Sequence, residues 1–213
     1  AKAFNGPVGQ WNTHSVTNMF RMFYHATSFN QPVGDWNMSN VTNITYMFSY
    51  ASKFNQSLNN WVFPKVVSLK GVLSGAKSFN GDIGDWDVSK VYSFSSFLSN
   101  GTSFNQDISS WDLGEARYLS HMFNGASSFN QDIGGWNVSK AIESDYMFRD
   151  AVSFNQDIGQ WDVSKITDMD WMFFNATSFN QDLSGWDVSN VPYGNYDRFY
   201  EGSALSGLNV PNF

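Results

Sequence analysis

The nine-residue stretch SFNQDIGGW at Ser128–Trp136 returns as SFNQDIGQW at Ser153–Trp161 and as SFNQDLSGW at Ser178–Trp186. It belongs to a longer pattern, because a Phe-Asn pair recurs every 25 residues from Phe4 to Phe179, eight times in all. Tryptophan keeps the same step from Trp11 to Trp186. A strict period between about 20 and 50 residues is typical of a solenoid, in which each repeat forms one coil and stacks on the next.

We number each repeat from its phenylalanine, which is position 1. Apolar residues at positions 5, 8, 10 and 13 match the spacing of a leucine-rich repeat, and the alternation at positions 8 and 10 predicts a short parallel strand. The apolar residues then change to helical spacing at positions 13, 16, 19, 20 and 23, with Gly or Asn often at position 22 as a left-handed stop. The sequence therefore predicts an α/β solenoid that is leucine-rich-repeat-like, with eight 25-residue turns that each hold one short strand and one short helix or 3₁₀ turn.

The ends of the pattern divide the chain into two expected parts. Residues 1–191 form the repeat solenoid, and Ala1 stands at position 23 of a repeat. Because a solenoid end needs a cap, we expect this segment to be part of a longer array that lacks its N-terminal cap. After Val191 the register breaks, so residues 192–213 are expected to form a C-terminal cap.

Composition excludes several classes of function. The net charge of −7 disfavours binding to nucleic acid, and we expect no such partner. No apolar stretch approaches the ~18 residues that a membrane span needs, so we expect no membrane insertion by this segment. The chain has no cysteine, which excludes disulfides and thiolate chemistry. No motif of a hydrolase, a phosphate-binding loop or a metalloprotease occurs, so we expect neither an enzyme nor a cofactor.

The corner of each repeat carries two recurrent polar residues. Asp at position 4 recurs in the later repeats, and we expect it to cap the following turn rather than to bind calcium, so no metal is assigned. Asn at position 2 is present in every repeat. We expect its amide to point inward and to satisfy backbone groups of its own turn and the next. This structural ladder consists of Asn30, Asn55, Asn80, Asn105, Asn130, Asn155 and Asn180.

Candidate binding residues lie at positions that vary between repeats. Positions 7 and 9 should point outward and form a stripe rich in acids and amides, in which Val62 is an apolar exception. The stripe is either a recognition face or merely a solvated one. On the helix side, Tyr46, Tyr146 and Trp171 either anchor a partner or pack against one another. The acidic candidates are Asp85, Asp87, Asp112, Asp162 and Asp187.

The repeats resemble those of a known family. The stretches NQDIGGWNVSK and SKITDMDWMFFNATSFNQDL and their copies are similar to the 25-residue repeats of BspA-like leucine-rich-repeat surface proteins of bacteria. The resemblance covers Phe4 to about Val191. It implies a location on the cell surface or outside the cell, adhesion or protein binding, and no catalytic residues.

From these observations we expect a non-catalytic binding or adhesion scaffold that recognises a macromolecular partner through its repeat surface. The partner is expected to be a protein or glycan on a cell surface, or a neighbouring copy of the chain. Two alternatives remain open. One is a structural subunit of a surface fibre or layer, and the other is a carbohydrate-binding module that uses the outer aromatic residues.

Overall fold

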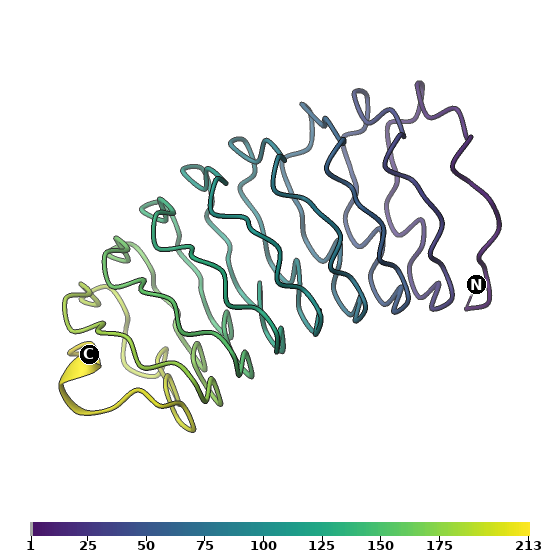
Figure 1. Cartoon of the computed structure of the whole chain (residues 1–213). Coiled ribbons are helices and arrows are strands. Elements are labelled where there is room, and N and C mark those ends of the chain that lie inside the picture. The colour runs from purple at the N-terminus through teal and green to yellow at the C-terminus, as the bar shows by residue number, and fades with distance from the viewer. Residues whose placement is uncertain (1) are drawn as a thin grey trace.

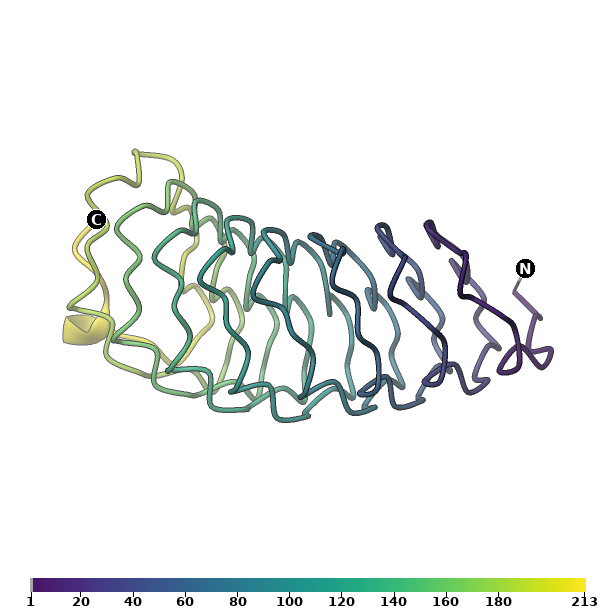
Figure 2. The same ribbon diagram turned by 90° about the horizontal axis from the view of Figure 1, so that it is seen from above.

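The computed structural model describes residues 2–213, which wind into coils stacked side by side from the N-terminal to the C-terminal end (Figure 1). Seen from above, the stack is gently curved (Figure 2). The only helix among the described residues is the 3₁₀ helix η1 (Gly207–Asn209). In the same range, β-structure is limited to isolated parallel bridges between neighbouring coils, at Asn18–Asn43, Ser68–Ser93, Ser93–Tyr118, Tyr118–Glu143 and Glu143–Asp168.

The prediction of an α/β solenoid with one strand and one helix in each turn is therefore wrong. The expected strand at positions 8–10 does not form because its flanking N–H groups close turns within their own coil. Trp36 N–H donates to the Val33 carbonyl at 3.1 Å, and Val41 N–H donates to the Met38 carbonyl at 3.0 Å. The alternation of apolar residues marks the side chains that face inward, but the backbone there makes no ladder with the next coil.

The expected helix at positions 16–23 is replaced by consecutive turns whose N–H groups serve two purposes. In the fourth coil, the N–H groups of Phe97 and Ser99 close turns onto carbonyls three residues earlier. The alternate groups, on Ser96 and Leu98, donate to the next coil at 2.9 Å. An α-helix uses its interior N–H groups within itself, so it is incompatible with this sharing. We call positions 14–22 of all coils the ladder side.

Two residues on the ladder side of each of the first seven coils adopt left-handed backbone conformations, at positions 18 and 22. Position 22 was expected to do so, whereas position 18 was not. Some of these residues are glycine, such as Gly71 and Gly75, but others are bulky, such as Tyr146 (φ 58°) and Trp171 (φ 57°). These reversals turn alternate N–H groups toward the neighbouring coil, and helical spacing in the sequence gives no sign of them.

The core consists of aromatic columns that run along the stack. Position 1 phenylalanines lie one above another, as Phe79, Phe104 and Phe129 do with ring centroids 6.0 Å apart. The position 8 tryptophans of coils 2–8 are buried, whereas Trp11 at the same position of the first coil is 49 % exposed. Each buried indole also donates its N–H to the position 5 carbonyl of the preceding coil, as Trp111 does to Ile83 at 3.2 Å. The columns therefore combine ring stacking with hydrogen bonds between coils.

The asparagine ladder exists, but it lies on the outside of the coil and not inside it. Asn30 Oδ1 accepts the N–H of Asn55 at 2.9 Å, and Asn105 Oδ1 accepts that of Asn130 at 2.9 Å. The amide side chains are exposed, because large rings already fill the interior. Every step of the ladder, from Asn5 to Asn180, has the same pairing.

The last part of the chain continues the ladder with a longer spacing. Met169 and Trp171 donate to the carbonyls of Asn195 and Asp197 at 2.8 and 2.9 Å, which is a step of 26 residues. Phe199 is buried against the last coil, and Phe213 stacks on Tyr196 with centroids 4.4 Å apart. Residues 192–213 thus cover the core at this end of the stack.

Candidate functional site

The predicted acidic stripe is exposed, but its carboxylates also hold the backbone. Asp87 Oδ1 accepts the N–H of Ser89 at 3.1 Å and its hydroxyl at 2.6 Å. These bonds hold the pKa of Asp87 below its ordinary value. Asp112, Asp162 and Asp187 accept the N–H two residues later in the same way. Because the neutral Asn37 and Asn137 make the same bond, the geometry requires an acceptor oxygen and not a charge.

Two further residues of the predicted stripe lie close together. Asp85 Oδ2 accepts the side-chain amide of Asn59, one coil earlier, at 2.7 Å. Val62 is 72 % exposed and shares a shallow hollow with Asp85 and Asp87. Val62 is therefore an apolar group held in solvent beside two carboxylates.

The position 4 aspartates cap turns, as predicted. Asp132 Oδ1 accepts the N–H of Gly134 at 3.0 Å, and Asp157 Oδ1 accepts that of Gly159 at 2.9 Å. Within residues 2–213, no group of three or more His, Asp or Glu side chains is arranged to hold a metal ion. The aspartate row thus has a local structural role in each coil.

The outer aromatic residues contact one another and arginines, in agreement with the packing interpretation. Trp171 stacks on Tyr146 with centroids 5.8 Å apart. The guanidinium of Arg149 lies 5.0 Å from the Trp171 ring centroid, and that of Arg198 lies 4.7 Å from it. We call Tyr146, Arg149, Trp171 and Arg198 the aromatic shelf. Tyr46 belongs to a separate group near the N-terminal end, where Arg21 lies 5.3 Å from its ring.

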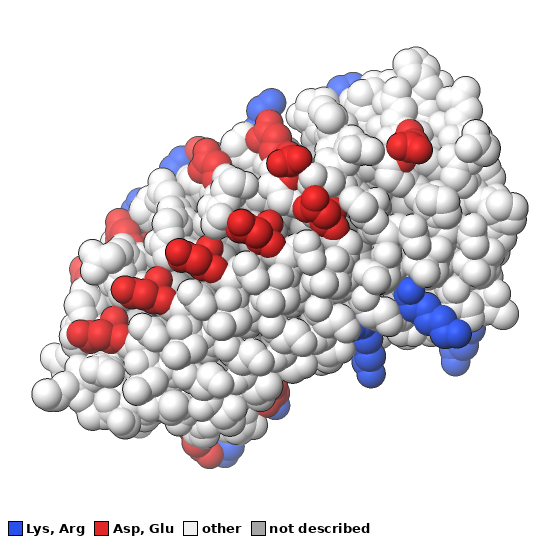
Figure 3. Space-filling view, viewed as in Figure 1, with Lys and Arg blue, Asp and Glu red and all other residues white. Residues whose placement is uncertain are grey.

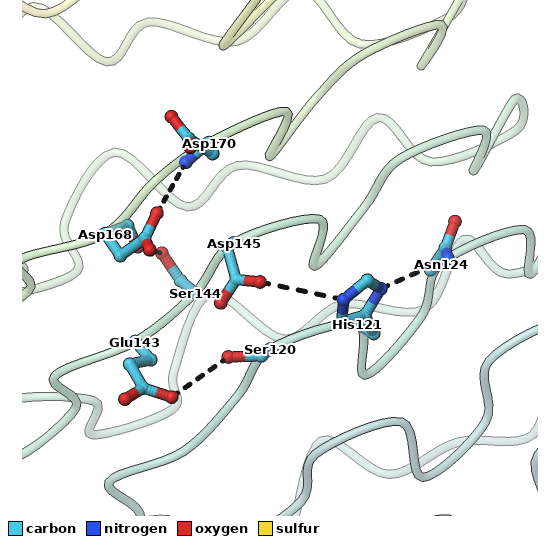
Figure 4. A network of polar contacts seen from close by, with 8 residues as sticks. All are labelled: Ser120, His121, Asn124, Glu143, Ser144, Asp145, Asp168 and Asp170. Atoms are coloured by element: carbon cyan, nitrogen blue, oxygen red, sulfur yellow. Dashed lines mark hydrogen bonds and ion pairs between the residues drawn. The ribbon is translucent and has the colours of Figure 1, made fainter. Parts of the chain in front are cut away.

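Beside the aromatic shelf lies a group of carboxylates that sequence reasoning missed. Positions 15 and 17 of the sixth and seventh coils hold Glu143, Asp145, Asp168 and Asp170, which we call the acidic cluster (Figure 4). All four residues are half-buried. Within the described chain, only Asp145 among them has an ion-pair partner, His121, with Nε2 and Oδ2 3.6 Å apart.

The remaining contacts of the acidic cluster are weaker. Glu143 accepts the hydroxyl of Ser120 at 3.4 Å. Asp168 accepts the N–H of Asp170 at 3.1 Å, and Asp170 accepts the N–H of Asp197 at 2.8 Å. These bonds orient the carboxylates without neutralising them. The face therefore presents several negative charges whose solvation is incomplete.

The incomplete solvation of the carboxylates shifts the pKa values of Asp168 and Asp170. Burial, followed by repulsion from Asp145, Asp170 and Glu143, raises the pKa of Asp168 above its ordinary value of 3.8. Burial and the neighbouring carboxylates of Asp197 and Asp145 also raise the pKa of Asp170. Burial lowers the pKa of His121, although Asp145 opposes this shift. At neutral pH the cluster thus carries charge that the fold disfavours.

A sequence signal for the cluster existed but was not used. Position 15 is Asn18, Asn43, Ser68 and Ser93 in the first four coils and then changes to Tyr118, Glu143 and Asp168. If positions 15 and 17 belonged to a helix, they would point in different directions, and the acids would not form one group. Only the ladder backbone places both positions on one surface.

We expect Asp168→Asn to stabilise the protein at neutral pH. The amide oxygen still accepts the Asp170 N–H, while the repelled charge is removed. Since the pKa is raised in the folded state, the wild type loses stability as pH rises above 3.8 through the raised value. The variant should gain a few tenths to about 1 kcal/mol at pH 7, after allowance for solvent screening. This gain should vanish below pH 3.8, as measured by urea unfolding at both pH values.

Asp87→Asn is the matched control with the opposite sign. The pKa of Asp87 is lowered, so its charge stabilises the fold above the ordinary value of 3.8 and loses this effect as pH falls through the lowered value. We therefore expect a loss of stability at pH 7 for this variant. Equal effects of the two substitutions would contradict our assignment of the acidic cluster as repulsive.

Comparison with known proteins places the repeats in a family. A family model described as "Mycoplasma protein of unknown function, DUF285" matches residues 1–78, 59–153 and 117–208. No curated protein matches the chain. Across residues 2–213, no helix combines the length and the apolar character needed to cross a membrane.

Proposed function

Because the chain belongs to the DUF285 family, whose description assigns no activity, we propose a function from its surface. The protein is a non-catalytic binding scaffold outside the cell or on its surface, and it recognises a macromolecular partner that presents cationic groups. The acidic cluster and the aromatic shelf together form the contact surface. The resemblance to BspA-like surface proteins supports the location, and the shape of an extended stack supports the scaffold role.

The observation that carries this proposal is that one region of the ladder side bears two unfavourable features together. In the acidic cluster, Asp168 and Asp170 are half-buried carboxylates whose pKa values burial raises. The adjacent aromatic shelf keeps Tyr146 and Trp171 in left-handed conformations, which cost bulky residues of order 1 kcal/mol each. Coils 3 and 4 place the small residues Gly71 and Ser96 at the same position. Stacking and the arginine contacts offset part of the cost of the aromatic shelf, but no ion pair offsets the charges of Asp168 and Asp170 within the described residues, and such uncompensated residues are typical of functional surfaces.

The constant residues of the repeat support the same assignment by contrast. The position 2 asparagines and the position 4 and 9 aspartates are used in bonds within or between coils. The asparagines recur in all eight coils and the aspartates from the fourth coil onward, each with the same kind of local bond, so they do not single out one region for a partner. The acidic cluster and the aromatic shelf occur only in the C-terminal half of the ladder side, so specificity is assigned there.

The test compares two variants that change the net charge by the same amount. Asp168→Asn/Asp170→Asn removes two charges from the acidic cluster, and Asp132→Asn/Asp157→Asn removes two from the position 4 row while keeping the acceptor oxygens. Binding is measured by biolayer interferometry on immobilised poly-lysine, basic proteins, acidic proteins and neutral glycans. We expect the first variant to lose at least tenfold in affinity for the cationic ligands, whereas the second stays close to wild type.

The same panel distinguishes the alternatives. Equal losses in both variants would mean that binding depends on net charge alone, and the proposal would be abandoned. Binding to neutral glycans that Trp171→Ala removes, with the acidic variants unchanged, would assign the aromatic shelf to carbohydrate recognition instead. The stability of Asp168→Asn provides a folding control, since the variant is expected to be more stable than the wild type at neutral pH.

A further inference from the structure

A second surface lies along the edge of the stack formed by positions 9–12, which precede the ladder side in each coil. Position 9 contributes an acidic stripe and position 12 a basic stripe, and both are exposed. In the space-filling view, carboxylates follow the upper edge while basic side chains emerge at the rim beside them (Figure 3). The acidic stripe is Asp87, Asp112, Asp162 and Asp187, and the basic stripe is Lys65, Lys90, Lys140 and Lys165.

The two stripes are close, yet their charges are not paired with one another. The hydrogen bonds from Ser89 and Ser164 are the main cause of the lowered pKa values of Asp87 and Asp162, and Lys90 and Lys165 are close enough to add a smaller lowering through space. Neither couple forms an ion pair within the described residues, where the only ion pair of the basic stripe is Lys140 with Glu115. Lys140 is thus engaged, and Lys65 donates to Asn40 Oδ1 at 2.8 Å, whereas the charged ends of Lys90 and Lys165 remain available for another molecule.

The ridge between the stripes allows close approach. Position 11 separates them and holds mostly small residues, namely Ser39, Ser89, Gly114, Ser139, Ser164 and Ser189. Because these side chains are small, another molecule can come close to the backbone along this ridge. Both charges stand in the same coil in the fourth and seventh coils, as Asp87 with Lys90 and Asp162 with Lys165, and these two coils give the edge a negative and a positive side.

We propose that two copies of the chain pair in parallel along this edge as a closed symmetric dimer. A two-fold axis parallel to the stack exchanges the two sides of the edge, so the acidic stripe of one copy lies on the basic stripe of the other. The axis leaves the coil order unchanged, so the same coil meets in both copies. Asp87 then faces Lys90 of the second copy, and Asp162 faces Lys165, each pair occurring twice because the interface is isologous.

Spacing favours a second copy over other anionic or cationic partners. The positions of each stripe repeat once per coil, at the ~4.8 Å distance between neighbouring backbones, so the charges are separated by whole multiples of that distance. Alternate side chains of an extended peptide repeat at about 6.8 Å, and the phosphates of one duplex strand advance about 3.4 Å along the axis. Only another stack of the same coils stays in register over several repeats.

Two details of the third and fifth coils fit this arrangement. In the third coil the acidic stripe is interrupted by the exposed Val62, while the exposed Val67 and Tyr92 lie on the basic side. Pairing places these apolar groups near one another across the interface. In the fifth coil Asp112 would meet Glu115 of the second copy, but Lys140 already pairs with Glu115.

The test uses reversed charges that remove self-pairing and then restore it in a mixture. Lys90→Glu/Lys165→Glu makes both sides of the edge acidic in the fourth and seventh coils, and Asp87→Lys/Asp162→Lys makes both sides basic there. Position 9 tolerates loss of its acceptor, since Val62 stands there in the third coil. We expect the wild type to sediment as a dimer that dissociates as salt is raised. Each variant alone should sediment as a monomer, and their equimolar mixture should recover the dimer.

The orientation is tested by cross-linking, for which the chain is suited because it has no cysteine. In a parallel dimer, Ser89→Cys should form a disulfide with itself under mild oxidation, because equal coils meet near the two-fold axis. Cross-linking of Ser89→Cys to Ser164→Cys, with neither linking to itself, would show an antiparallel dimer and overturn the proposal. A wild type that stays monomeric at every concentration, or two folded variants whose mixture stays monomeric, would also overturn it. Ligand binding by the acidic cluster is unaffected by either outcome.

Discussion

Phe104→Ala is expected to lower the free energy of unfolding by about 3–5 kcal/mol. Phe104 is fully buried, and its ring lies between those of Phe79 and Phe129 at 6.0 Å on either side. Removing the ring leaves a cavity in the middle of a column that neighbouring coils cannot close, because their rings are held at the coil spacing. Urea unfolding followed by tryptophan fluorescence measures the loss.

Phe4→Ala is the matched control for this prediction. Phe4 occupies the same position in the first coil and stacks on Phe29 at 6.0 Å, but it is 36 % exposed. Its substitution should cost clearly less than that of Phe104, since solvent already reaches the ring. Similar losses at both positions would mean that the column is not the source of stability. In a stack where each coil contacts only its neighbours, the central cavity should also broaden the unfolding transition.

Gly71→Ala is expected to cost about 2–4 kcal/mol, although it adds a single methyl group. Gly71 has φ 61°, which disfavours an L side chain. A Cβ atom there would overlap the ring of Tyr46 from the preceding coil. The ring would have to leave its place beside Arg21. Thermal or urea unfolding of the variant gives the change in stability.

Two further variants separate the steric cost from the conformational one. Ser96→Ala lies at the same position in the next coil, with φ 57°, and should change stability by no more than about 0.5 kcal/mol. In Tyr46→Ala/Gly71→Ala the ring is absent, so the second substitution should cost only its backbone strain. A double-mutant cycle without coupling between Tyr46 and Gly71 would show that ring overlap plays no part.

Much of the candidate site was within reach of sequence analysis. Tyr146 and Trp171 were expected on the outside because the inward apolar positions did not need them, and the structure places them in the aromatic shelf. Asp87 and Asp162 were expected to be exposed, and they are. The acidic cluster was missed because its members stand at positions 15 and 17, which a helix would turn apart. The asparagine ladder was predicted on the wrong side of the backbone. The spacing of apolar residues does not show that large rings already fill the interior of the coil.

The amino-acid pattern by itself determined the period of 25, the stacking of one coil on another and the side chains that face inward. Burial of apolar surface depends on residue type and spacing, and both can be read directly from the chain. Only the tertiary structure decided the backbone conformation between these inward-facing residues. From position 18 to position 22 the N–H groups of the first seven coils bond either within their coil or to the next, and the left-handed residues at positions 18 and 22 select between the two. That choice depends on groups 24 residues away, so no local pattern of helix or strand records it.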